Sequence, residues 1–538
     1  MFKSSLLKKI FIFCITVTSL FSCISGKASD TILNKSSNTE IIYHVFERSF
    51  YDSNGDHIGD LNGLKEKLGY LQDLGVTSIL LLPLYKSVYY HNYYSSDFYK
   101  IDSTLGTMKD YISLVKEIHR RGMKIYMDME TQYVTEDHPW YKSAINNPKS
   151  PYSNYILFED SAHTRPATFV FGLRGWTGYN GVYKKIVTVN LKNKEVLDYN
   201  IRLFKHWVDP NNDGKFDDGV DGFRFDHMMD DLDNKPQLKN LFQSFWLPLI
   251  TALKKINPNL KDVAEVANWN SWGRKYISSG VTDRVFSFKL MGAIRSFNKN
   301  YLSRMTDSAY KFFPDGDRQI VFIENHDLPR FSDGVHHSLP KLKIGAALNL
   351  LLGWIPSIYY GQEIGMESSS ASAKWGLNDG NDIPKREAFE WYKSDTGKGM
   401  AIWYKNTGPW WDSTNLKPND GISLEEEKPD PNSIYNFYKK MISIRKNNPV
   451  ISTGKYENLD NTNNSVFSYQ RYDPENTIIV VINLSAIDQN AEVMYPGYDP
   501  KKKDIKILNG NVAPLVFGKD FQIKLPPYGI EVFQLTRK

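Results

Sequence analysis

Short apolar runs alternate with longer amphipathic stretches from about residue 40 to residue 446. Ser78-Ile-Leu-Leu-Leu has the pattern of a buried strand, Tyr111 to Arg121 carries apolar residues at helical spacing, and Lys124-Ile-Tyr-Met-Asp128 has the pattern of the next strand. This alternation predicts successive strand–helix units, in which parallel strands form a sheet and helices cover it. We therefore expect an α/β fold over most of the chain.

The alternation breaks down in two places. Between Asp128 and about Val196 the sequence is rich in Pro, Asn and Gly, and this stretch is too long for an ordinary connection. After a predicted helix from Ser433 to about Lys446, runs such as Thr477-Ile-Ile-Val-Val-Ile indicate an antiparallel β domain. A chain of 538 residues is also too long for one compact core, so two or three domains are expected.

In three short segments of the sequence, an apolar, strand-like run is followed by an acidic residue. Cleavage of a glycosidic bond needs one carboxylate that attacks the anomeric carbon and one carboxylic acid that protonates the leaving oxygen. A third acid can hold sugar hydroxyls while positive charge builds on the ring. Together the strings favour glycoside hydrolysis. They are Gly222-Phe-Arg224-Phe-Asp226, Val263-Ala-Glu265-Val and Phe322-Ile-Glu-Asn325-His326-Asp327.

One such string would be weak support for catalysis. An acid at a strand end is often a turn former or a helix N-cap. In a barrel of parallel strands, however, the C-terminal strand ends face the active site. Three acids at three strand ends are therefore expected to converge.

The three strings resemble the signature regions of the α-amylase family, glycoside hydrolase family 13. The resemblance includes a first strand at Ile41-Ile-Tyr-His-Val-Phe and a last strand beginning at Ile355, and it covers roughly residues 40 to 538. It implies a (β/α)8 TIM barrel, a small domain B inserted after the third strand, and a C-terminal antiparallel β-sandwich domain. The expected segments are a signal peptide at 1–22, a lipidated tether at 23–38, the barrel at 39–128 and 197–448, domain B at 129–196, and the C-terminal domain at 449–538.

The resemblance also implies a role for each acid. Asp226 is the expected nucleophile, Glu265 the general acid/base, and Asp327 the transition-state stabiliser. Arg224 is expected to orient Asp226 and to keep it ionised, because a neighbouring cation lowers the pKa of a carboxyl group. The other expected substrate contacts are His326, Tyr93, Asp128 and Tyr133.

Members of this family hydrolyse α-glucosidic bonds with retention of configuration, through a covalent intermediate. We expect an endo-acting, α-amylase-like enzyme whose substrates are α-glucans: starch, maltooligosaccharides or pullulan. An exo-acting α-glucosidase, or a cyclomaltodextrinase/neopullulanase, is the alternative. A non-catalytic glycan-binding homologue is a more remote one, because such proteins typically lose at least one of the three acids.

Three positions depart from the family pattern. Gln132-Tyr133 stands where the family usually has Asn-His, Thr188 stands where domain B usually has an Asp, and Asp230 lies where many amylases have part of a Lys-His pair. These changes argue against the family's calcium site between the barrel and domain B. In addition, Tyr94 replaces a usual Asp beside Tyr93, which is expected to keep its stacking role under the sugar.

Two loops have the oxygen-rich pattern of a calcium site. Calcium takes six to eight oxygen ligands, and a tight Asp/Asn loop supplies several from one short segment. Neither loop has the Glu of an EF-hand at its twelfth position, where Gly63 and Val220 stand. Asx-rich turns without metal are the alternative. The expected ligands are Asp52, Asn54, Asp56, Ile58 and Asp60 in the first loop, and Asp209, Asn211, Asp213, Lys215 and Asp217 in the second.

The N-terminus has the pattern of a secretory signal. Three lysines precede an apolar run from Ile10 to Phe21 that is too short to span a bilayer. The run ends in Leu20-Phe-Ser-Cys23, which resembles a bacterial lipobox and predicts a lipid on Cys23. We therefore expect an exported, membrane-anchored lipoprotein on the periplasmic or cell-surface face. An ordinary signal with an incidental Cys is the alternative.

Charge excludes other classes of partner. The formal net charge of +5 falls to +2 once the three signal lysines are removed. The chain has no basic block and no Gly-rich phosphate loop, so roles in nucleic-acid or nucleotide binding are not expected. The expected partners are an α-glucan and, through the lipid anchor, a membrane.

Overall fold

The computed structural model describes residues 39–314, 318–368, 374–411, 416, 418–495, 503–510, 514–517 and 520–537. The predicted signal peptide, Cys23 and the tether lie outside these residues. In the part of the chain that is described, no helix has the length and apolar character needed to cross a bilayer. All of the described residues belong to one compact unit, Ser37–Lys538.

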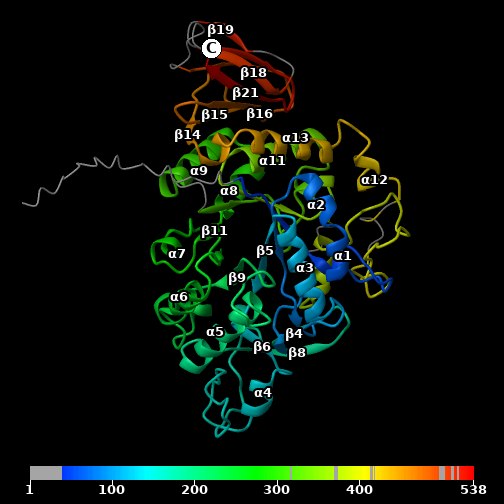
Figure 1. Cartoon of the computed structure of the whole chain (residues 1–538), viewed down its shortest axis with the longest axis vertical. Helices are drawn as coiled ribbons and strands as arrows, with labels where there is room; N and C mark the ends of the chain where they lie inside the picture. The colour runs from blue at the N-terminus through cyan, green and yellow to red at the C-terminus, as the bar shows by residue number, and fades with distance from the viewer. Residues whose placement is uncertain are drawn as a thin grey trace, which may run out of the picture. The chain divides into compact units, whose positions relative to one another are not determined.

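Eight parallel strands close into a barrel (Figure 1). Each strand pairs with its neighbours in parallel, and side chains that alternate along the strands fill the interior with apolar groups such as Tyr126, Phe286 and Phe322. The predicted α/β TIM barrel is confirmed. In order around the barrel the strands are β1 (Ile42–Val45), β2 (Ser78–Leu81), β5 (Lys124–Met129), β9 (Gly222–Met228), β10 (Lys261–Val266), β11 (Arg284–Phe286), β12 (Gln319–Val321) and β13 (Ile355–Tyr359).

Amphipathic helices surround the barrel. In α3, Tyr111, Leu114, Val115 and Ile118 are buried, as the helical spacing predicts. The helix begins at Met108, earlier than predicted, because Thr107 forms a capping box with Asp110. The main helices are α1 (Leu61–Glu66), α2 (Leu68–Leu74), α3 (Met108–Arg120), α5 (Lys194–Val208), α6 (Leu247–Ile256), α8 (Phe288–Arg295), α9 (Lys299–Phe312), α11 (Leu339–Leu351) and α13 (Ile434–Asn447).

The irregular stretch between β5 and β9 forms a small inserted sheet. Its antiparallel strands are ordered β6 (Tyr133–Thr135), β8 (Tyr183–Thr188) and β7 (Gly175–Thr177), and it is accompanied by α4 (Pro139–Ala144). An isolated bridge between Ser95 and Val134 joins this sheet to the loop between β3 (Tyr85–Lys86) and β4 (Asp97–Ile101). The inserted sheet and the β3–β4 loop therefore lie together beside the C-terminal ends of the barrel strands.

The C-terminal segment forms two antiparallel sheets that share one apolar core. Residues such as Val481 of the first sheet and Ile523 of the second belong to the same buried cluster. The predicted antiparallel β domain is confirmed. The first sheet is ordered β14 (Lys455–Asn458), β15 (Val466–Tyr472), β16 (Thr477–Asn483), β21 (Ile530–Arg537) and β18 (Lys503–Asn509), and the second β17 (Gln489–Val493), β20 (Asp520–Leu525) and β19 (Leu515–Phe517).

Two buried arginines lie where this domain meets the barrel: Arg445 joins two barrel helices there, and Arg471 joins the domain to the barrel. Arg445 of α13 donates to the carbonyl of Leu350 at 2.8 Å, at the C-terminal end of α11. Arg471 of β15 donates to the carbonyl of Gly454 at 2.7 Å and stacks over Tyr310, 4.7 Å from the ring centroid. A helix end presents unpaired carbonyls with partial negative charge, so the Arg445 guanidinium satisfies groups that burial would otherwise leave unpaired.

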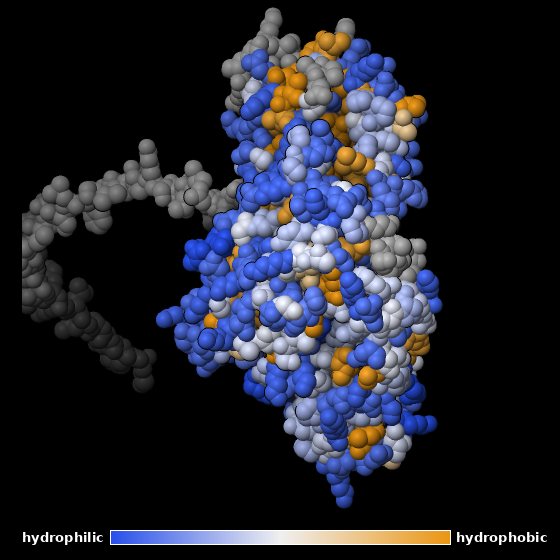
Figure 2. Space-filling model, turned by 90° about the vertical axis from the view of Figure 1, so that its right-hand side faces the viewer, coloured by the Kyte–Doolittle hydropathy of each residue, from blue (hydrophilic) through white to orange (hydrophobic). Residues whose placement is uncertain are grey.

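The outer surface is largely hydrophilic on the face shown in Figure 2, and its hydrophobic residues gather most densely towards the top, on the C-terminal domain. Exposed apolar side chains of that domain include Ile487 and Leu515. On the barrel and its insertion, the most exposed large apolar side chain among the described residues is Phe171, at 91%. That residue lines the cavity described below.

The junction between barrel and C-terminal domain gives a stability prediction. Gly353 has φ +121°, and a Cβ there would lie 1.9 Å from the Tyr310 hydroxyl oxygen. Gly122 also has positive φ, at +71°, but a Cβ there meets nothing within 4 Å. We expect Gly353→Ala to cost about 3 kcal/mol or more and Gly122→Ala only about 1 kcal/mol, since the second pays for backbone strain alone. Thermal unfolding of the two variants measures the difference, and equal losses would contradict the close approach.

Candidate active site

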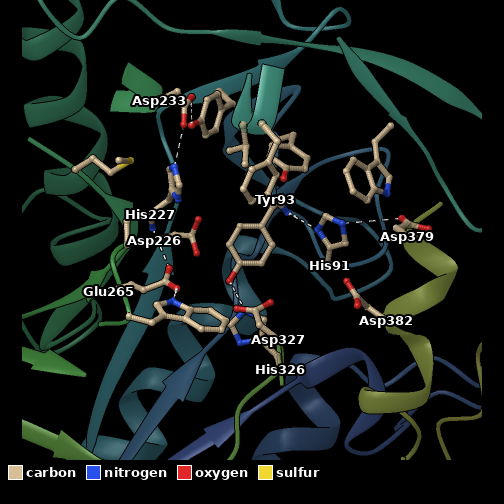
Figure 3. A pocket seen from close by; sticks show the side chains of 18 of the residues that line it. His91, Tyr93, Asp226, His227, Asp233, Glu265, His326, Asp327, Asp379 and Asp382 are labelled. Carbon is tan, nitrogen blue, oxygen red and sulfur yellow. Dashed lines mark hydrogen bonds and ion pairs between the residues drawn. The ribbon is translucent and has the colours of Figure 1, made fainter. Parts of the chain in front are cut away.

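A cavity of about 840 Å³ lies at the C-terminal ends of the barrel strands. Asp226 and Glu265 come from the ends of β9 and β10, and Asp327 comes from the loop after β12. The three acids surround one space in Figure 3. The structure thus brings together the three acids that the sequence placed in separate strings.

A single guanidinium ties three carboxyl groups from neighbouring strands. Arg224, which is 2% exposed, donates from Nη1 to Asp226 Oδ1 at 2.7 Å and from Nη2 to Glu265 Oε2 at 2.9 Å, and its Nη1 also hydrogen-bonds Asp128. Arg224 pairs with Asp128 of β5 and with Val263 of β10 in the strand register, so all these side chains start from the same level of the barrel. This placement explains why the Arg and the acids meet.

Tyr93 and His326 extend the network towards Asp327. The Tyr93 hydroxyl donates to Asp128 Oδ2 at 2.7 Å and therefore accepts from Nε2 of His326 at 3.0 Å. Burial holds the pKa of His326 well below its usual value. His326 is consequently neutral at neutral pH and carries its proton on Nε2, which also lies 3.1 Å from Asp327 Oδ2.

The nucleophile and acid candidates form a coupled pair. Burial raises the pKa of Asp226 well above its usual value, and the neighbouring carboxylates add to this effect against the opposing charge of Arg224. Burial also raises the pKa of Glu265, but Arg224 and the His227 N–H, which donates to Oε2 at 3.0 Å, lower it overall. The two carboxyl groups therefore titrate as one coupled pair, and Arg224 does not outweigh burial at Asp226 as the sequence led us to expect.

The cavity has two chemically different sides (Figure 3). His91, Asp379 and Asp382 lie on one side of the acids, while His227 and Asp233 lie on the other, with Asp226 between them and Glu265. Burial raises the pKa of Asp379 to about 8, so its carboxyl group is protonated at neutral pH and can donate to a sugar hydroxyl.

Several residues of the site were not singled out from the sequence. Arg386 lies 3.3 Å from Asp327 Oδ1 and donates to the carbonyl of His326 at 2.9 Å. Asp233 links His227, at 3.1 Å, to the Tyr133 hydroxyl, which donates to it at 2.6 Å. Of these residues, only Arg386 had a sequence signal, because it lies in Lys385-Arg-Glu-Ala-Phe-Glu-Trp391, which resembles a segment found in amylases of the family.

The three positions that depart from the family pattern hold protein hydrogen bonds. The Gln132 side-chain amide donates to the carbonyls of Asp226, at 2.5 Å, and His227, at 3.2 Å. Thr188 donates to the carbonyl of Thr168, and Asp230 accepts from the Phe242 N–H at 2.8 Å. Gln132, at the start of the inserted segment, thus fixes the backbone at Asp226 and His227.

In both predicted calcium loops, Asp side chains accept hydrogen bonds from backbone N–H groups of the same loop. Asp52 accepts from the N–H groups of Asn54, Gly55 and His57, and Asp60 caps α1. Asp209 accepts from the N–H groups of Asp213 and Gly214 in the same way. The loops remain rich in the oxygen donors that calcium prefers, but in the described ranges no three His, Cys, Asp or Glu side chains group closely enough to hold a metal on their own. Backbone and Asn oxygens would have to complete either site.

Comparisons with known proteins agree with this geometry. Residues 44–454 match the family described as alpha amylase, catalytic domain, and residues 456–532 match the maltogenic amylase C-terminal domain. Alpha-amylase 3 of Dictyoglomus thermophilum is 31% identical over 86% of this chain and 88% of its own length. Oligo-1,6-glucosidase of Parageobacillus thermoglucosidasius is 27% identical over 92% of this chain and 98% of its own length.

A solved structure extends the likeness to the whole architecture. The α-amylase of H. orenii superposes with a TM-score of 0.75 at 28% identity, over 93% of this chain and 99% of that one. The family match covers well over half of the chain, and the three acids stand at the ends of the barrel strands where a glycosidase needs them. The chain therefore belongs to the α-amylase family, glycoside hydrolase family 13, and is an α-amylase-type glycoside hydrolase that acts on α-glucosidic bonds.

Proposed function

We propose that this enzyme is an endo-acting, retaining hydrolase of α-glucans. The observation that carries the proposal is the convergence of Asp226, Glu265 and Asp327 in a cavity that continues on both sides of the acids. A cavity with lining residues on both sides can hold glucosyl units on either side of the cleaved bond. The α-amylase relative supports the same substrate class.

In the proposed reaction, Asp226 attacks the anomeric carbon while Glu265 protonates the leaving oxygen, so the glycosidic bond breaks as a glucosyl–aspartate ester forms. Asp327 and Arg224 stabilise the positive charge on the ring and the negative charge on the attacking carboxylate. Glu265, now a carboxylate, takes a proton from water, and the hydroxide oxygen displaces Asp226. Two displacements restore the α configuration.

An exo-acting α-glucosidase is the second candidate, because oligo-1,6-glucosidases are among the relatives. Time-resolved chromatography of products from amylose and pullulan tests the proposal. Endo action is expected to release a mixture of oligosaccharides early, with a rapid fall in polymer length. Release of glucose alone, while the polymer shortens slowly, would favour the exo enzyme instead.

Isosteric amide substitutions test the two catalytic roles. Asp226→Asn is expected to abolish turnover because an amide does not form the ester, and Glu265→Gln is expected to lower kcat by about 10²–10⁴-fold because it donates no proton. Steady-state assays on maltooligosaccharides measure both. Asp198→Asn, the same change on α5 and outside the cavity lining, is the matched control and is expected to retain activity. Substantial turnover by folded Asp226→Asn would rule out the nucleophile assignment.

We also propose calcium at the loops Asp52–Asp60 and Asp209–Asp217. Asp52, Asp60 and Asp209 are buried, the loops supply alternating side-chain oxygens, and members of this family often bind calcium. The ions would brace loops at the edge of the barrel. A ligand that binds only the folded state stabilises it by mass action.

Melting curves with added calcium and with a chelator test this proposal. Calcium at a hundredfold excess over its dissociation constant is expected to stabilise the fold by ~2.7 kcal/mol. Asp56→Ala removes an exposed ligand of the first loop, so it is expected to reduce the calcium response and to leave the melting temperature in chelator nearly unchanged. Identical curves for the wild type in both conditions, with no metal by elemental analysis, would reject both sites.

We further propose that the mature protein is anchored to a membrane by lipid on Cys23 and faces the periplasm or the cell exterior. The charged start, the short apolar run and the Leu20-Phe-Ser-Cys23 ending support it. Stable attachment needs more than one acyl chain, which the bacterial lipoprotein modification provides.

Fractionation of cells that express the full chain tests the anchor. The wild type is expected in the membrane fraction, and Cys23→Ser in the soluble fraction or unprocessed. Cys14→Ser, a change within the predicted signal, is the control and is expected to stay with the membrane. A soluble wild type with a free N-terminus at another residue would contradict the lipobox interpretation.

A further inference from the structure

Trp269 is held rigidly at the edge of the cavity. Its ring stacks on Phe288 with centroids 4.6 Å apart and an interplanar angle of 7°. Phe288 packs edge-on against Phe322, at 5.1 Å, and Phe322 belongs to the apolar interior of the barrel. An aromatic series therefore runs from the barrel core to Trp269 and fixes the orientation of the indole.

The other face of Trp269 is available to a ligand. The residue is 41% exposed, although it is packed on Phe288, and it lines the cavity. It follows Glu265 in the loop after β10, so it lies on the side from which the acid acts. A rigid apolar face beside a polar site is the usual platform for the apolar face of a sugar ring.

Trp269 also contacts the catalytic acid directly. Its indole N–H points at Glu265 Oε1, at the long distance of 3.4 Å. Oε2 already accepts from Arg224 and from the His227 N–H. A proton on the carboxyl group is therefore better accommodated on Oε1, the oxygen beside Trp269, because Oε2 is occupied by donors.

We propose that Trp269 is a specificity-determining and positioning residue, which stacks under the leaving-group sugar and holds Glu265 Oε1 towards the glycosidic oxygen. This inference rests on the proposed glycosidase function. When Oε1 gives its proton to the leaving oxygen, the indole N–H donates to the carboxylate that forms and the departing sugar stays on the ring. Once that sugar has dissociated, water attacks the ester and gives hydrolysis, or a second sugar stacks on the same face and its hydroxyl attacks, which gives transfer.

Two variants separate the two contributions. Trp269→Ala removes both the platform and the N–H, whereas Trp269→Phe keeps an aromatic face and removes the donor. Trp272→Phe is the matched control, because Trp272 lies on the same loop, packs edge-on against Phe312 and does not line the cavity. The purified enzymes are compared on maltotriose and on α-glucosyl fluoride, whose leaving group is not a sugar and needs little protonation.

Trp269→Ala is expected to lower kcat/KM for maltotriose by about tenfold or more, the size of one good aromatic contact, while changing kcat/KM for glucosyl fluoride less than about twofold. Trp269→Phe is expected to keep most of its affinity for maltotriose but to move the alkaline limb of the kcat/KM profile to higher pH. The reason is that a lost donor to the carboxylate raises the pKa of Glu265. Trp272→Phe is expected to match the wild type in both respects.

Equal losses on both substrates for Trp269→Ala would overturn the platform, because they would show a defect in binding the glucosyl unit or in folding. An alkaline limb unchanged in Trp269→Phe would overturn the positioning of Glu265. If Trp269→Ala does not fold, Trp269→Phe still tests both contributions. Its pH profile decides whether the indole N–H positions Glu265, and its KM for maltotriose decides whether an aromatic ring serves as the platform. Failure of the glycosidase proposal is distinct, since the wild type itself would then turn over neither substrate.

Discussion

The buried guanidinium of Arg224 is the interaction on which the site depends. Asp128, Asp226 and Glu265 would repel one another in a space from which water is largely excluded, and Arg224 contacts all three. Removing one partner from a buried ion network leaves uncompensated charge and is far more costly than losing a surface pair. The barrel makes this arrangement possible, because β5, β9 and β10 are neighbours whose side chains at one level project into the same space.

The inserted segment is joined to β9, the strand that carries Asp226, by hydrogen bonds. Gln132 binds the carbonyls after β9, and the Tyr133–Asp233–His227 network connects the insertion to the loop that follows. His227 and Asp233 both have positive φ, 43° and 50°, conformations that non-glycine residues adopt at a cost. These contacts hold the strained backbone beside Asp226. Gln132 and Tyr133, the pair at one of the departures from the family pattern, thus join the two parts through an amide and a hydroxyl group.

Sequence patterns predicted the barrel and the three acids because both follow from local order. A strand–helix alternation repeats along the chain, and each acid lies near the end of a strand or in the loop that follows it, as with Glu265 in β10 and Asp327 after β12. Asp233 and Trp269 reach the site from loops whose course is set by tertiary packing, which no short string records. Tyr133 shows that a role expected from the family resemblance does not always follow from a residue's position in the sequence. A sugar contact was expected of its hydroxyl, which in the folded chain donates to Asp233, and that contact stays a prediction.

The difference between the two sides of the cavity has a consequence for selectivity. On the side of His91, Asp379 and Arg386 the wall consists of polar groups held in fixed directions, and such groups reject a sugar whose hydroxyls do not match them. The wall also includes Trp269, from the loop after β10, and the exposed Phe171, and aromatic rings can stack on a sugar without a strict demand on the orientation of its hydroxyls. If Asp226 attacks as we propose, the polar groups select the captured glucosyl unit strictly, whereas the aromatic rings select the leaving or accepting sugar loosely. Such an arrangement would suit glucans of varied length on the leaving-group side, with one kind of unit at the point of cleavage.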